Sequence, residues 1–283
     1  MTLTEILQGY SISAPDFKLI VLTLIMILSG FVSGVTGFGF SFIAAMALFL
    51  FEPKELIPLL LILSTVTQFA SIWKLRDSMI PFRDWWKDGP LPFIVGGASG
   101  VPLGLWVLYT LNPLALCEVV GFIIVAYATY LFIAKPKSLP SAPTMKARLF
   151  AGFCGGVIGG FTAAPGCAIV IWAGVSGITK QKQRAIVQPF IICVQLFTIY
   201  EQLGKPGAIS APLFVYATLL CLFVVPANQY GVSIFKKITD ISFNRIVQIL
   251  LAGMGFALIN KGFHIWGELF MSLHLRHPLF GLG

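Results

Sequence analysis

An eight-residue glycine motif occurs twice in the chain and limits the possible folds more than any other feature. Residues 30–37 read GFVSGVTG and residues 152–159 read GFCGGVIG, so five of the eight positions are identical. Both copies lie inside long apolar stretches. Glycine-rich, irregular backbone at membrane depth is tolerated only where protein buries it or where it lines a cavity. Two such runs at corresponding positions of two halves are typical of the binding site of a transporter.

Composition places the chain in a membrane. Of its 283 residues, 57% are hydrophobic and 11% are charged, whereas soluble domains carry about 25% charged residues. Apolar segments near the length of a membrane span recur throughout, which predicts an all-α polytopic membrane protein. The net charge of +8 comes from residues in short loops, so it indicates membrane topology and gives no reason to expect a nucleic-acid partner. The expected segments are 17–51, 56–74, 90–109, 114–134, 149–176, 186–203, 211–232 and 246–264.

Two of these segments, 17–51 and 149–176, contain the glycine motifs and are longer than one ordinary span. Glycine costs about 1 kcal/mol in a helix interior and proline about 3 kcal/mol. We therefore expect both segments to break in the middle, each forming a hairpin of two shorter helices whose tip lies near the middle of the bilayer. A single crossing by each broken segment is the alternative.

Basic loops predict the orientation. They fall at 74–87, 135–148, 177–185 and 233–245, and the positive-inside rule places all of them in the cytoplasm. Each half is then one hairpin plus about three spans, with both chain termini on the periplasmic side. Because three is an odd number of spans, the second half begins on the opposite side of the membrane from the first, so its topology is inverted relative to the first half. The predicted parts are an N-terminal segment 1–16, membrane repeat 17–135, cytoplasmic linker 136–145, inverted membrane repeat 146–265 and tail 266–283.

The motifs resemble those of a known family. Residues 34–40 (GVTGFGF) followed by Glu52-Pro53 are similar to the first-half motif of the sulfite exporter TauE/SafE family. Gly156, Gly159 and Gly160 with Pro165-Gly166 and then Arg184-Ala185 are similar to its second-half motif. The resemblance extends over about residues 17–265. It implies an integral membrane transporter that moves small anions, namely sulfite, organosulfonates and related carboxylates, usually outward.

A compact anion is best bound without a fixed membrane-buried cation that would trap it. Such an anion can be bound without a charged side chain. Free backbone N–H groups at a half-helix N-terminus, which glycines allow the anion to approach closely, can donate hydrogen bonds to it, and so can hydroxyl and amide side chains. We expect the tips 36–41 and 159–166 to approach each other, with Gln68 and Gln195 at matching places in the two halves. The expected substrate-binding residues are Thr36, Gly37, Gly39, Ser41, Gln68, Gly159, Gly160, Thr162, Pro165, Gly166 and Gln195.

Other interpretations of these residues remain open. The glycines also suit small-residue packing seams between helices, and the two glutamines suit interhelical hydrogen bonding. Arg184, with Lys180 and Lys182, is expected at the cytoplasmic mouth, either as a topology signal or as an entrance funnel that concentrates anions.

The leading function is a secondary transporter that exports a small anion, most plausibly sulfite or an organosulfur compound, by alternating access. An anion channel and a non-transporting scaffold or sensor are the alternatives. The three histidines lie near the C-terminal end and no His-Glu-x-x-His pattern occurs, so neither an enzyme nor a metal centre is expected, and no cofactor. Protons or sodium are possible coupling ions, a homodimer is possible, and the expected location is the bacterial inner membrane.

Overall fold

The computed structural model describes residues 17–44, 46–47, 53–110, 144–162, 164–203 and 211–253, with five single positions or pairs beyond these (121–122, 125–126, 129, 255–256 and 259). The described residues form helices and no strand. Four of the described helices are long and apolar enough to cross a membrane, as expected for a polytopic membrane protein. The elements are α2 (Phe17–Thr36), α3 (Phe40–Ala44), α4 (Pro53–Leu75), the 3₁₀ turns η2 (Arg76–Ser78) and η3 (Phe82–Asp84), α5 (Leu91–Thr110), α7 (Met145–Thr162), α8 (Gly166–Val175), α9 (Lys180–Leu203) and α10 (Ala211–Lys237), followed by helical residues 240–253.

Both long apolar segments break, as the sequence predicts. The first is divided between α2 and α3 and the second between α7 and α8, and in each case the shorter helix packs against the longer one. In the second hairpin the return is tight, because a Cβ added to Gly159 would stand 2.6 Å from the Cβ of Pro165. The two segments are therefore helical hairpins with unequal arms.

Each motif helix packs against a helix of the other half. Helix α2 lies along α10, and α7 lies along α5. At the closest points a Cβ on Gly34 would stand 2.1 Å from the carbonyl oxygen of Asn228, and a Cβ on Gly156 would stand 2.1 Å from that of Gly97. These distances leave no room for any side chain, so the glycines serve the small-residue packing that the sequence allowed as an alternative.

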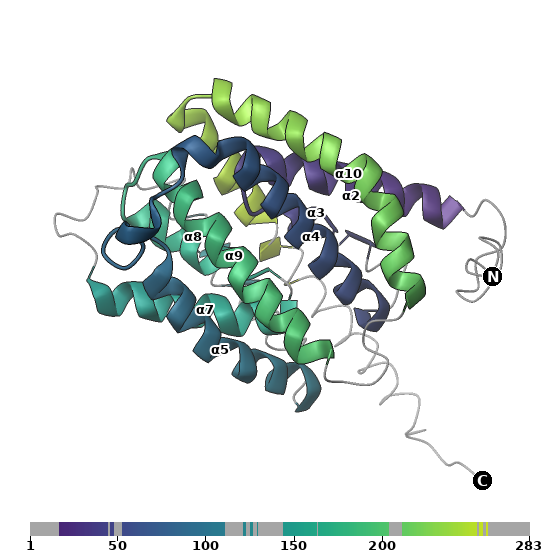
Figure 1. Cartoon of the computed structure of the whole chain (residues 1–283), viewed down its shortest axis with the longest axis horizontal. Coiled ribbons are helices and arrows are strands. Elements are labelled where there is room, and N and C mark those ends of the chain that lie inside the picture. The colour runs from purple at the N-terminus through teal and green to yellow at the C-terminus, as the bar shows by residue number, and fades with distance from the viewer. Residues whose placement is uncertain are drawn as a thin grey trace, which may run out of the picture.

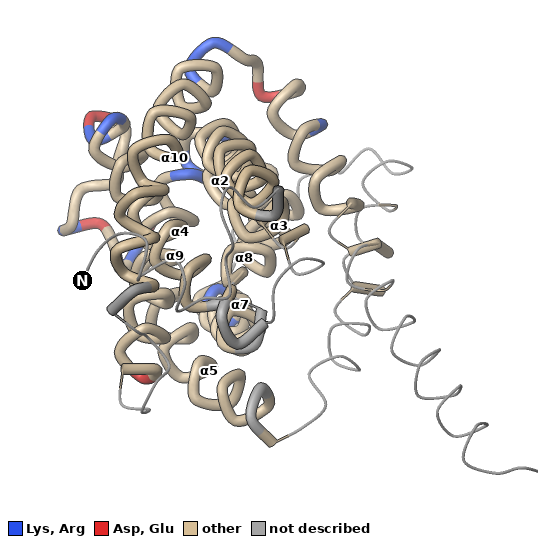
Figure 2. Tube along the Cα trace, turned by 90° about the vertical axis from the view of Figure 1, so that its right-hand side faces the viewer, with Lys and Arg blue, Asp and Glu red and all other residues tan. Residues whose placement is uncertain are grey.

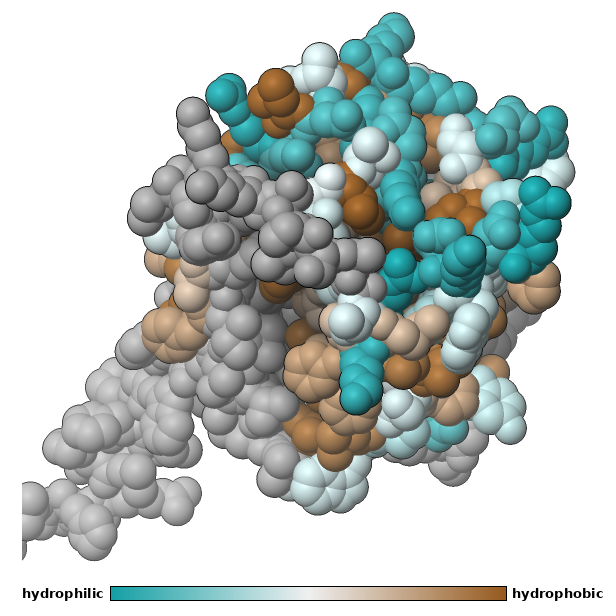
Figure 3. All heavy atoms as spheres, turned by 90° about the vertical axis from the view of Figure 1, so that its left-hand side faces the viewer, coloured by the Kyte–Doolittle hydropathy of each residue, from teal (hydrophilic) through white to brown (hydrophobic). Residues whose placement is uncertain are grey.

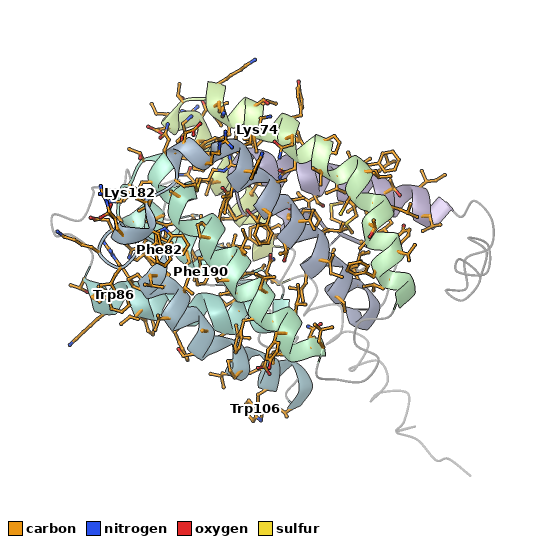
Figure 4. The ribbon with its side chains drawn as sticks, in the orientation of Figure 1. Lys74, Phe82, Trp86, Trp106, Lys182 and Phe190 are labelled. Carbon is orange, nitrogen blue, oxygen red and sulfur yellow. The ribbon has the colours of Figure 1, made fainter. Side chains whose placement is uncertain are left out.

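The two helix pairs flank a central layer. Figure 1 shows α2 and α10 along one side, α5 and α7 along the other, and α4 and α9 between them. Hydrogen bonds connect residues 64 and 65 to residue 195, and residue 68 to residue 188, so α4 and α9 run in opposite directions. Phe190 of α9 fills the space beside Gly97 and Gly155, near the middle of the molecule (Figure 4).

The described parts of the four basic loops gather at one end of the molecule. Arg148 donates to the carbonyl oxygen of Lys87 at 2.5 Å, and Lys182 lies 3.8 Å from Asp88. Lys236 donates to the carbonyl oxygen of Lys74 at 3.4 Å. In Figure 2 most described Lys and Arg residues lie at helix ends and in loops, and Figure 3 shows hydrophilic side chains over much of the described surface at this end.

Several predictions lie outside the described residues. They are the N-terminal segment 1–16, the apolar segment 114–134 apart from a few positions, most of the linker 136–145 and the tail 266–283. The domain boundaries and the inverted relation of the two repeats stay predictions.

Candidate functional site

The two hairpin tips meet inside the molecule. A Cβ on Gly166, the first residue of α8, would stand 3.1 Å from the Cβ of Phe38 and 2.8 Å from the Cδ1 of Ile191. Phe38 belongs to the first tip, and Ile191 lies midway along α9. The tips therefore approach each other beside the middle of α9, as the sequence analysis expected.

The first tip turns sharply because of Gly37 and Thr36. Gly37 has a φ of 84°, and its N–H donates to the carbonyl oxygen of Ser33 at 2.7 Å, so it ends α2 in the left-handed conformation typical of helix C-caps. The hydroxyl of Thr36 donates to Val32 at 2.9 Å and accepts the N–H of Gly39 at 3.1 Å. The hydroxyl proton of Thr36 is thus already used within the tip, which differs from the free donor that the sequence analysis expected.

Arg184 holds the carboxyl end of α2 from the other half of the chain. Its Nη2 donates to the carbonyl oxygen of Gly34 at 2.7 Å, and its Nη1 donates to that of Val35 at 3.4 Å. The residue is 1% exposed, and its guanidinium lies 4.3 Å above the ring of Phe235. A cation at a helix C-terminus interacts favourably with the helix dipole and with unpaired carbonyl groups.

This position of Arg184 differs from the exposed cytoplasmic mouth expected for an entrance funnel. The residue is the fifth of α9, and the first tip and α10 cover it. Carbonyl groups and an aromatic face stabilise this guanidinium, which could not be buried alone. A role for Arg184 in admitting anions stays a prediction.

Lys180, one turn earlier on α9, has a comparable structural role. Its Nζ donates to the carbonyl oxygen of Phe235 at 2.9 Å and also to that of Ile238, at the carboxyl end of α10. It lies 4.8 Å from the centre of the Phe235 ring. The two cations of α9 therefore hold the ends of two different helices on either side of one aromatic ring.

Buried amide and hydroxyl side chains connect α4 with α9. Gln195 donates to the hydroxyl of Ser64 at 2.9 Å and accepts the hydroxyl of Thr65 at 3.2 Å. Gln188 donates to the Oε1 of Gln68 at 3.1 Å, and Gln68 donates to Ser33 of α2 at 3.5 Å. Both predicted glutamines thus form interhelical hydrogen bonds, which was one of the two open interpretations.

The second tip has a different character. Helix α8 begins at Gly166 after Pro165, and no side chain caps its first turn. Gly166 and Cys167 are buried, so the N–H groups at the start of α8 lie inside the protein. Such a terminus carries the positive end of the helix dipole and suits an anion.

The remaining predicted residues lie around these tips. Ser41 is buried in α3, whereas the side chain of Thr162 falls outside the description. Gly160 packs against Gly104 of α5, where a Cβ would stand 2.9 Å from the Cα of Gly104. Gly39 lies against Val32, Gly159 against Pro165. Only part of the predicted set is therefore brought to the meeting point of the tips.

The sequence analysis missed Gln188, which is completely buried and whose Oε1 has no hydrogen-bond partner among the described residues. A signal was present. Polar residues recur along α9 at steps of three, four or seven, which places them on one helical face. That stripe comprises Lys180, Arg184, Gln188, Gln195, Thr198 and Gln202, all of them buried.

Among the residues that the structure describes, no three His, Cys, Asp or Glu side chains lie together in a way that could hold a metal ion.

Long apolar helices, two broken hairpins and buried polar contacts between the halves define a polytopic helical membrane protein. The chain belongs to the sulfite exporter TauE/SafE family, whose model matches residues 22–258. The family is one of membrane transporters of sulfite or related anions rather than enzymes. No curated protein and no solved structure is significantly similar to the chain.

Proposed function

We propose that this protein is a secondary transporter that exports sulfite or an organosulfonate by alternating access, with the anion bound where the two hairpin tips meet. The observation that carries the proposal is the contact of Phe38 in the first tip with Gly166 at the start of α8. Broken helices that meet at mid-membrane are where transporters bind their substrates.

The amino terminus of α8 is the anion-facing part of this site. Its first-turn N–H groups lack a side-chain cap, and its first residue, Gly166, lies against Phe38 of the first tip. These groups stabilise negative charge without a full positive charge of their own. A compact anion would therefore be bound firmly enough to be selected and weakly enough to leave.

The way the helices are paired suggests rocking between two packed helix pairs, each with one helix from either half. Each motif helix packs along a helix of the opposite half, α2 with α10 and α7 with α5, and α4 runs opposite to α9. This reciprocal pairing is what two inverted repeats would give, and it supports the inverted relation. Movement would then occur at the hydrogen-bonded contact between α4 and α9, while each tightly packed pair moves as a unit.

We place the end with the basic loops in the cytoplasm and both chain termini in the periplasm of a bacterial inner membrane. Exposed tryptophans near the two ends of α5 support an arrangement in which α5 crosses the bilayer from one interface to the other. Trp86 is 51% exposed beside the basic loops, and Trp106 is 53% exposed toward the far end (Figure 4). Tryptophan is enriched at both membrane interfaces. We also propose that export is coupled to protons or sodium and that the protein forms a homodimer.

The test is flux from proteoliposomes that contain the purified protein. Vesicles are loaded with sulfite, a taurine-like sulfonate or a small carboxylate, and loss of each is measured with and without an imposed membrane potential. Saturable, potential-sensitive efflux of sulfite or a sulfonate, absent from protein-free vesicles, is expected. Saturation and counterflow distinguish a transporter from a channel. Folded protein that moves none of these anions would refute the proposal.

A further inference from the structure

We propose that Arg184 contributes a second anion-binding element: the side-on edge of its guanidinium, formed by Nε–H and the outer N–H of Nη2, binds two oxygens of an oxyanion. This inference rests on the proposed function and names a residue and a ligand geometry within it. The favoured ligands carry two or more equivalent oxygens on one atom, as sulfite, sulfonates and carboxylates do.

The argument begins with the two edges of a guanidinium. Arginine presents five N–H donors in a planar arrangement, with one fork at its end and another along its side. In this structure Nη1 and Nη2 each donate to one carbonyl oxygen, those of Val35 and Gly34. The Nε atom on the side fork has no hydrogen-bond partner among the described residues.

An unpaired donor at this depth requires an explanation. Buried polar atoms in native proteins nearly always have partners, and leaving one unpaired costs about 1–3 kcal/mol, more for a charged group. The described ion pairs lie elsewhere and at the surface, so no described carboxylate neutralises Arg184. The guanidinium retains both a free donor and an uncompensated positive charge, which are the two properties that an oxyanion satisfies.

Gly37 of the first tip lies directly against this edge. A Cβ on Gly37 would stand 3.3 Å from Nε and 3.2 Å from Cγ of Arg184, so any larger residue at position 37 would crowd the side fork. The next residue, Phe38, contacts Gly166 at the amino terminus of α8. The free edge of Arg184 and the uncapped end of α8 therefore lie against neighbouring residues of the same tip.

A purely structural role would make Arg184 equivalent to Lys180. Both are buried cations of α9, both contact the ring of Phe235, and both donate to carbonyl oxygens at the end of another helix. They differ in the side fork, which only arginine has. Lys180→Gln is accordingly the matched control, because it removes a helix-capping cation without touching the proposed fork.

The experiment compares Arg184→Lys, Arg184→Gln and Lys180→Gln with the wild type in reconstituted vesicles. The readouts are KM for sulfite and inhibition constants for methanesulfonate, a fork-matched oxyanion, and for bromide, a spherical anion. Arg184→Lys keeps the charge and can still cap α2, so it is expected to fold. We expect it to raise the sulfite KM and the methanesulfonate constant by about tenfold or more, as charge-assisted hydrogen bonds predict, and to change the bromide constant far less. Lys180→Gln should leave all three constants near wild type.

An equal change for oxyanions and bromide, or no change per folded protein, would overturn the inference while leaving export intact. If neither arginine variant folds, Gly37→Ala tests the same edge with the guanidinium present, and unchanged constants there would also overturn it. If the wild type shows no flux, sulfite binding is measured by calorimetry. Binding lost in Arg184→Lys alone would keep the site and reject export, and no binding by the wild type would reject both.

Discussion

The two hairpins start from the same eight-residue motif but turn at different places. In the first half α2 ends at Thr36, the seventh motif position. In the second half Ile158 occupies that position, and α7 continues for one more turn to Thr162. The shared glycines fix how the motif helices pack, and the residues around them fix where each helix stops.

The local chemistry explains the difference. Thr36 closes the first turn by accepting the N–H of Gly39, and Gly37 adopts a positive φ. Ile158 has no hydroxyl, so the second helix continues until it nears Pro165, whose ring disfavours helical conformation in the residue before it. The first turn is stabilised by hydrogen bonds and the second by a proline.

The two tips also differ in the charge that reaches them. Arg184 of the second half caps the first motif helix. Arg184 lies eleven positions before Gln195, and the residue eleven positions before Gln68 is the apolar Ile57. The two tips therefore differ, with one next to a guanidinium and the other forming a helix N-terminus without a side-chain cap.

The largest expected effect tests what the halves share. Gly34→Ala and Gly156→Ala should each destabilise the protein by about 3 kcal/mol or more, because each new Cβ would meet a backbone oxygen that cannot move aside. Thermal unfolding in detergent measures the loss. Gly253→Ala is the control, since nothing lies within 4 Å of a Cβ there. Tolerance of the change in one half alone would show that the two seams are not equivalent.

A smaller effect separates the tips. Thr36→Val should cost about 1–2 kcal/mol, because the buried N–H of Gly39 loses its acceptor. Thr198→Val is the matched control, since its hydroxyl donates to the carbonyl oxygen of Val194 in its own helix and its loss should change stability little. Chemical denaturation of both variants compares them. Equal losses would mean that the Thr36 hydroxyl does not hold the turn.

The smallest effect concerns the contact between the halves. A double-mutant cycle on Gln68 and Gln188 should give a coupling energy of about 1 kcal/mol for their buried hydrogen bond. The same cycle on Lys182 and Asp88, an exposed pair 3.8 Å apart, should give about 0.5 kcal/mol or less. A larger coupling at the surface pair would mean that polar side chains couple the halves more strongly at the basic loops than between α4 and α9.

Much of the fold could be predicted from the sequence. Long apolar segments require helices in a bilayer, because backbone hydrogen bonds cannot be satisfied otherwise in lipid. The glycine motifs located both breaks, and the motif residues identified the family. These inferences depend on residue type and spacing along the chain.

The site was less predictable. Gln68 and Gln195 were found because they occupy matching positions, whereas Gln188 has no counterpart and was missed although its helical spacing marks it as buried. Arg184 was predicted to lie at the cytoplasmic mouth, because basic residues near the start of a membrane helix usually lie at the membrane surface. Its burial depends on carbonyl groups 149 and 150 residues earlier in the chain.

The sequence by itself determined that this is a helical membrane protein with a helix break at each of two glycine motifs, and to which family it belongs. Composition and local backbone preference act within a short stretch of chain, so they can be recognised there. Only the tertiary structure decided which helix each half packs against, that the tips meet at Phe38 and Gly166, and that Arg184 lies buried under the first tip. Those outcomes depend on contacts between residues far apart in the chain, such as Gly97 with Gly156 and Gly34 with Asn228, and no local pattern specifies them.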